Sequence, residues 1–117
     1  MTDAQLPTFG SGTTPKPPYY AAIFAYQRTE GEDGYDAMAE RQAELVQQQP
    51  GFLAVESVQG SDGIGMVVVY WKDAESITNW KNQALHLEAQ KLGRLRWYKR
   101  YQVRVAKVER AYGFGDA

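Results

Sequence analysis

The stretch Met66–Trp71 constrains the fold more than any other part of the chain. It places six apolar residues in succession, MVVVYW, without a polar residue between them. Successive side chains of a strand point to opposite faces of a sheet, so a strand of this kind needs apolar surroundings on both faces. The helices of a 117-residue chain can cover one face of a sheet, and we expect a second copy of the chain to cover the other.

The order of the predicted elements defines the fold class. They are a strand at Tyr19–Arg28, a helix at residues 35–46, strands at Phe52–Gln59 and Ile64–Trp71, a helix capped by Asp73, and a strand at about Tyr101–Tyr112. This βαββαβ order predicts an α+β, ferredoxin-like fold, in which an antiparallel sheet carries its helices on one face. A two-fold homodimer that packs sheet on sheet would cover the bare face.

Two segments carry separate expectations. Residues 1–18 are rich in Thr, Gly, Ser and Pro and are predicted to form a flexible N-terminal arm, which leaves residues 19–117 as the single folded domain. In the last strand, the apolar positions change phase after Val105, which predicts a β-bulge near Val105-Ala106. A strand that crosses onto a partner's sheet would show the same change.

Composition excludes several classes of chemistry. The chain has no cysteine and one histidine, so disulfides, thiolate nucleophiles, zinc–thiolate sites and multi-histidine metal sites are excluded within one chain, and we expect no metal. A net charge of -1 argues against a nucleic-acid or membrane binder. Basic residues gather in residues 91–110, either as solvated surface or as a rim that attracts an anionic ligand. Without a membrane span or secretory signal, we expect a cytoplasmic protein.

The turns and helices carry a family resemblance. The segments that show it are Pro50–Leu53, Tyr70–Glu75, Asn79–Lys81, His86–Gln90 and Arg96–Tyr98. Over about Tyr19–Tyr112 the chain resembles the antibiotic biosynthesis monooxygenase domain family, a branch of the dimeric α+β barrel superfamily. The resemblance implies a dimer whose sheets form a barrel, with a pocket in each subunit between the sheet and the helices.

His86 and Trp80 are the candidate catalytic residues. The resemblance implies that both line the helical wall of the pocket. His86 has the only side chain whose ordinary pKa lies near neutrality, so it could take a proton from a phenol or anthrone, or ligate iron; it could equally be a satisfied surface histidine. The two residues are six positions apart, about 120° around an unbroken helix, and they converge only if the helix breaks near residues 82–84.

The candidate substrate-binding residues are Tyr20, Phe24, Tyr26 and Asn79. The three aromatic residues share one face of the first strand, where they form either a platform for a flat aromatic substrate or ordinary packing against the helices. Asn79 could orient a substrate carbonyl, although an asparagine on a helix surface is usually solvated.

Three functions remain open on the sequence alone. The first is a cofactor-independent monooxygenase of a small aromatic or quinol-type substrate. The second is a haem-binding or haem-degrading protein, and the third is a non-catalytic dimeric ligand-binding module. Haem-degrading relatives have an iron-binding histidine where this chain has Gln90, and an asparagine on the first strand, whereas Tyr19–Glu30 contains none. The glycines of residues 60–65 lie between two strands, so neither flavin nor nicotinamide is expected.

Overall fold

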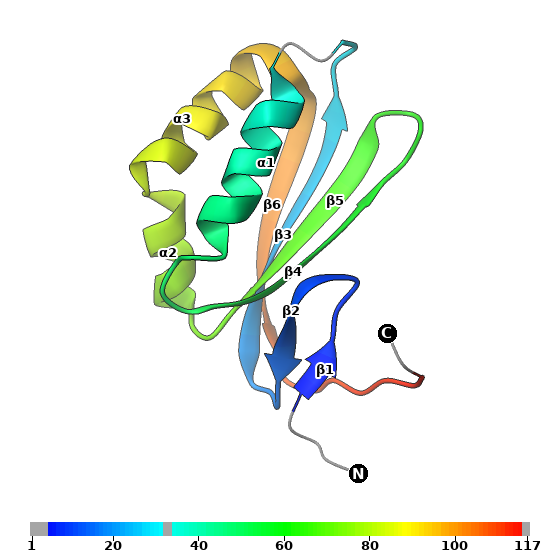
Figure 1. The fold of residues 1–117 in the computed structure, drawn as a ribbon, viewed down its shortest axis with the longest axis vertical. Coiled ribbons are helices and arrows are strands. Elements are labelled where there is room, and N and C mark those ends of the chain that lie inside the picture. Colours follow the sequence, from blue (N-terminus) through cyan, green and yellow to red (C-terminus); the bar gives the residue numbers. More distant parts are fainter. Residues whose placement is uncertain (1–4, 32–33, 116–117) are drawn as a thin grey trace.

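The computed structural model describes residues 5–31 and 34–115, which form an antiparallel six-stranded sheet with helices packed on one face (Figure 1). The strand order is β1-β2-β4-β5-β3-β6. The strands are β1 (Gln5–Pro7), β2 (Gly10–Pro15), β3 (Tyr19–Arg28), β4 (Phe52–Gln59), β5 (Ile64–Trp71) and β6 (Tyr98–Val108). The helices are α1 (Tyr35–Val46), α2 (Ala74–Lys81) and α3 (Ala84–Leu92), and a π-helical turn, η1 (Gly93–Trp97), leads into β6. The α+β, ferredoxin-like fold predicted from the order of elements is confirmed.

The register of β3 and β5 separates the two faces of the sheet. Trp71 lies opposite Tyr20, and its ring contacts Trp80 of α2, so this set of side chains faces the helices. Trp71 is fully buried, whereas Met66, which points to the opposite face, is 40% exposed. The apolar run in β5 therefore forms a core on the helix side, and its other face is open to solvent in a single chain.

The N-terminal segment differs from its prediction as a flexible arm. Residues 5–15 form a β-hairpin, and β2 extends the sheet by pairing with β4. Gly12 pairs with Ala54 at a φ of 91°, and a β-carbon at this position would overlap the carbonyl oxygen of Leu53. The glycines that suggest mobility in the sequence are therefore the residues that allow the two backbones to approach.

The predicted bulge near Val105-Ala106 is wrong. Strand β6 pairs with β3 in unbroken register through both residues, and the register shifts at the other end of the pair, between Gln27 and Arg28. β6 is an edge strand that carries apolar side chains on both faces, and its residues from 102 to 107 are exposed. The change of phase therefore reflects a second apolar face and not an inserted residue.

Gly51 fixes the turn between α1 and β4 and gives a test of the fold. Its φ is 87°, and a β-carbon there would overlap the buried side chain of Ser76. We expect Gly51→Ala to lower the free energy of unfolding by about 2–4 kcal/mol, as measured by urea denaturation. Gly31 is the matched control, because it has a φ of 85° and a β-carbon added there would meet none of the described residues within 4 Å. Equal losses in the two variants would contradict a steric role for Gly51.

In residues 5–31 and 34–115, no helix combines the length and the apolar character needed to cross a bilayer.

Candidate functional site

A capping side chain marks the start of each of the helices α2 and α3. The Oδ1 atom of Asp73 accepts hydrogen bonds from the backbone N–H and the hydroxyl of Ser76, at 2.8 and 2.6 Å, and so starts α2. Helix α2 ends at Lys81, and Gln83 starts α3 by accepting a 3.0 Å hydrogen bond from the backbone N–H of His86. The helix therefore breaks near residues 82–84, which is the condition under which Trp80 and His86 can converge.

The break brings His86 onto Trp80. The two rings are stacked, with 4.1 Å between their centroids and 23° between their planes. The Nδ1 atom of His86 lies 2.9 Å from Oε1 of Gln42, which comes from α1. The Nε2 atom of Gln42 donates to the sulfur of Met38 at 3.8 Å, which turns the amide oxygen toward the imidazole. This arrangement places the proton of neutral His86 on Nδ1 and leaves a lone pair on Nε2.

Burial keeps His86 neutral. Removal of the imidazole from water lowers the pKa of His86 from 6.5 to about 4. At pH 7 the side chain is therefore uncharged, and it is a weaker base than a solvent-exposed histidine. A phenol or an acidic C–H group placed next to Nε2 could transfer a proton to it, and the imidazolium and the substrate anion would then stabilise each other.

The same pKa shift predicts a pH-dependent stability. The folded-state pKa of His86, about 4, lies below the unfolded value of 6.5, so the unfolded chain binds the proton first as the pH falls. The contribution is fully present above pH 6.5 and is lost through the window down to pH 4. We expect His86 to remove about 3 kcal/mol of stability between pH 7 and pH 4. The free energy of unfolding in urea should fall by about 3 kcal/mol more between pH 7 and pH 4 in the wild type than in His86→Gln. An equal fall in the two proteins would contradict this assignment to His86.

Trp71 forms the floor beneath Trp80. Its ring centroid lies 6.4 Å from that of Trp80 and 6.1 Å from that of Phe52, which meets it edge-on. The Nε1–H of Trp71 is buried and has no hydrogen-bond partner among the residues that the structure describes. Tyr20 lies opposite Trp71 in the sheet. This end of the helix–sheet layer is therefore aromatic, and its polar groups include the lone pair of His86 and the Nε1–H of Trp71.

A second aromatic cluster lies at the other end of the same layer. Phe24, Tyr26 and Tyr98 have ring centroids within 5.2–5.3 Å of one another, and Tyr35 of α1 meets Tyr98 edge-on at 5.9 Å. The guanidinium carbon of Arg28 lies 3.5 Å from the centre of the Tyr35 ring. Burial raises the pKa values of Tyr26 and Tyr35 to about 12. These hydroxyls are neutral at pH 7 and are hydrogen-bonding groups rather than bases.

The structure brings together some of the predicted site residues and separates others. Tyr26 lies opposite Gly65, six residues along β5 from Trp71, a separation of about 20 Å along the strand. The ring contacts of Phe24 and Tyr26 lie within the second cluster. Tyr20 shares the end of the sheet where Trp71 lies. Asn79 is exposed on α2, so the structure gives no support for its contact with a buried substrate.

Residues that the sequence patterns did not single out also build the layer. Gln42 and Tyr35 lie seven positions apart on one face of α1, about 10 Å along the helix axis, and each contacts one of the two clusters. Their helical spacing on the apolar stripe is a usable signal, because a polar residue on such a stripe needs a partner. Among the described residues, no group of three or more His, Asp or Glu side chains is placed to hold a metal ion.

Comparison with known sequences gives a family match. The sequence model of the family described as antibiotic biosynthesis monooxygenase matches residues 19–92, from β3 to α3. An uncharacterised protein of Bacillus subtilis, YqjZ, is 48% identical over 97 residues, which cover 83% of this chain and 85% of the relative.

Solved structures show the same fold at low identity. A variant of SnoaB, a cofactor-independent oxygenase from Streptomyces nogalater, has a TM-score of 0.69 at 13% identity and covers 80% of this chain and 95% of its own. A conserved protein from Methanosarcina mazei has a TM-score of 0.68 at 13% identity and covers 76% of this chain and 91% of its own. At these identities, the likeness concerns the fold alone.

Proposed function

Because the chain belongs to the antibiotic biosynthesis monooxygenase family, we propose that it is a cofactor-independent monooxygenase of a small, electron-rich aromatic or quinol-type substrate. The observation that carries the proposal is the neutral imidazole of His86, stacked on Trp80 and held through Nδ1 by Gln42. The shared fold with SnoaB, a cofactor-independent oxygenase, supports chemistry without a cofactor.

The proposed mechanism needs one base and an apolar site. A flat substrate lies against Trp80 and gives a proton to Nε2 of His86, and the resulting anion is electron-rich enough to reduce dioxygen. For an anthrone-type substrate, the methylene carbon and O₂ are converted to a ketone and water. One oxygen atom enters the product and the other leaves as water, so the substrate itself supplies all the electrons.

An oxygen electrode tests this proposal. Purified protein, treated with a chelator, is mixed with an anthrone or a hydroquinone, and oxygen uptake is compared with that of the protein-free solution. We expect uptake proportional to protein concentration, with no added metal, flavin or haem. Substrate binding without uptake would instead favour a ligand-binding module, and saturable haem binding that is lost in His86→Ala would favour a haem protein.

We also propose that the chain forms a homodimer through the bare face of its sheet. Exposed apolar side chains gather there, with Val58 69% and Met66 40% exposed, next to a cavity of about 260 Å³ that Phe9 and Val68 help to line. An apolar surface of this kind on a sheet is typical of an interface between subunits. The proposed partner would also cover the second face of β5.

The dimer gives a direct prediction. Light scattering after size exclusion should give about 26 kDa at micromolar concentration, twice the 13.2 kDa of the chain. Met66→Glu should shift this mass toward that of one chain, because it places a charge in the apolar interface. Leu95→Glu is the control, since Leu95 is 70% exposed but lies in η1, away from this face. A wild-type mass of 13 kDa would contradict the dimer.

A further inference from the structure

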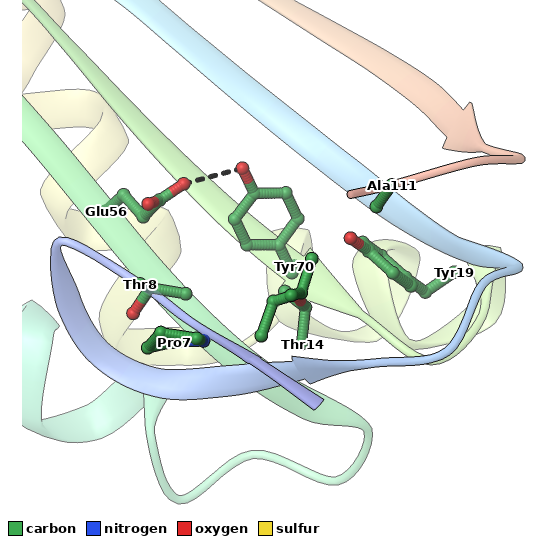
Figure 2. Close-up of a pocket in the computed structure, with 8 residues that line it drawn as sticks. Pro7, Thr8, Thr14, Tyr19, Glu56, Tyr70 and Ala111 are labelled. Carbon is green, nitrogen blue, oxygen red and sulfur yellow. Dashed lines mark hydrogen bonds between the residues drawn. The ribbon is translucent and has the colours of Figure 1, made fainter. Parts of the chain in front are cut away.

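We propose that a cavity between the β1–β2 hairpin and the sheet binds a small organic ammonium ion. The cavity has a volume of about 190 Å³ and lies on the face of the sheet opposite His86 (Figure 2). The hairpin contributes Leu6, Pro7, Thr8 and Thr14 to its lining, and the sheet contributes Tyr19, Glu56 and Tyr70. The site is therefore separate from the one proposed for oxygenation, and its test does not depend on that function. It lies at the end of the sheet face where the hairpin contributes to the lining, and it adjoins, through Glu56, the part of that face proposed to form the dimer.

Two tyrosine rings form adjoining sides of the cavity. Tyr19 and Tyr70 meet edge to face, with 5.7 Å between their centroids and 85° between their planes. Tyr19 is 4% exposed, so its ring is held in place by its surroundings. The faces of aromatic rings carry negative charge density and attract organic cations, and this attraction is stronger where water is excluded.

Glu56 supplies a negative charge on the same lining. Its Oε1 atom accepts a 2.7 Å hydrogen bond from the hydroxyl of Tyr70, and its Oε2 atom accepts a 3.0 Å hydrogen bond from the backbone N–H of Phe9. Both donors are neutral, and no Lys, Arg or His is among the described residues that line the cavity. A carboxylate held among neutral groups on a largely apolar sheet face is stabilised by a cationic ligand.

The β1–β2 hairpin, which forms one side of the cavity, lies outside the part of the chain that matches the family, residues 19–92. It is anchored by the β2–β4 pairing and by the contact of Glu56 with Phe9. The hydroxyl of Thr8 donates to the carbonyl oxygen of Gly12 at 2.9 Å, and its oxygen keeps lone pairs for an N–H group or for the polarised methyl groups of a quaternary ion. A carboxylate, two tyrosine side chains and a threonine hydroxyl thus line one small cavity.

A matched pair of ligands tests the proposal on the unmodified chain. Choline and 3,3-dimethylbutan-1-ol have nearly the same shape, but only choline carries a charge. In NMR titrations, we expect choline to saturate the protein and to shift the ring signals of Tyr19 and Tyr70, while the neutral alcohol binds at least tenfold more weakly. Equal binding of the two ligands, or no saturation by choline at millimolar concentration, would overturn the proposal.

A variant and a vesicle experiment complete the test. Glu56→Gln keeps the shape of the side chain and removes its charge, and it should weaken choline binding at least tenfold. Glu75→Gln, at an exposed position on α2, should leave binding unchanged. Loss of affinity in both variants or in neither would contradict the role of Glu56. Phosphatidylcholine vesicles distinguish the source of the ion: we expect binding of the free ion, and binding to vesicles alone would overturn it.

Discussion

Replacement of Trp71 by alanine is expected to lower the free energy of unfolding by about 3–5 kcal/mol. Trp71 is fully buried, and its ring lies between Phe52 and Trp80. Alanine would lose the burial of an indole and leave a cavity directly beneath the Trp80–His86 stack. Guanidinium denaturation followed by far-UV circular dichroism measures the loss, because the remaining tryptophans would complicate a fluorescence signal.

An exposed aromatic residue provides the control for this prediction. Tyr112 is 84% exposed, so Tyr112→Ala should change the free energy of unfolding by less than about 0.5 kcal/mol. A Trp71→Ala loss close to that of Tyr112→Ala would show that the packing between β5 and α2 does not stabilise the fold. Trp71→Phe, which keeps an aromatic ring, should fall between the two.

Replacement of His86 by alanine is expected to lower the turnover rate at least tenfold, and a drop of about 10²–10⁴ is typical when a general base is removed. The imidazole is neutral, its Nδ1 atom is held by Gln42, and no other histidine exists in the chain. The tyrosines of the second cluster cannot replace it as bases, because burial raises the pKa values of Tyr26 and Tyr35 to about 12. Initial rates of oxygen uptake at saturating substrate provide the measurement.

Two variants separate catalysis from structure in this experiment. Glu88→Ala changes an exposed residue of α3 two positions further on and should leave the rate unchanged. His86→Gln keeps a neutral polar side chain at the site but lacks a basic nitrogen, so it should be as slow as His86→Ala. A wild-type rate in His86→Gln would remove His86 from the role of base and leave it a packing residue.

The local pattern of apolar residues in the sequence predicts the fold and part of the candidate site. The unbroken apolar run of β5 and the helical spacing on α1 predict the layers, because burial on a sheet or helix face has a fixed period. The contact between Trp80 and His86 depends on a break at Asn82-Gln83, which neither proline nor glycine marks. The side chain of Gln83 caps α3 at this break. The partner of His86, Gln42, is 44 residues away, beyond the reach of any periodicity.

Two of the predictions that the structure corrects have a common cause. The alternation of side chains along β3 assigns Tyr20 and Tyr26 to the same face of the sheet, but it does not show which residues of the helices each one meets. The two tyrosines lie at opposite ends of the layer between the sheet and the helices and do not form a single platform. Composition likewise describes residues 1–18 as flexible, although Gly12 owes its place in β2 to a pairing with Ala54, a residue distant in the sequence. Both errors arise from reading a local signal where a non-local contact decides.

Isotopic labelling tests the central claim, cofactor-independent monooxygenation, most directly. Chelator-treated protein is allowed to convert an anthrone under ¹⁸O₂. The ¹⁸O content of the product is determined by mass spectrometry, and oxygen uptake is recorded in parallel. We expect one ¹⁸O atom in each product molecule, one O₂ consumed for each, and a rate that depends on His86. Product without label, or formation no faster than in the protein-free solution, would contradict cofactor-independent monooxygenation by this protein.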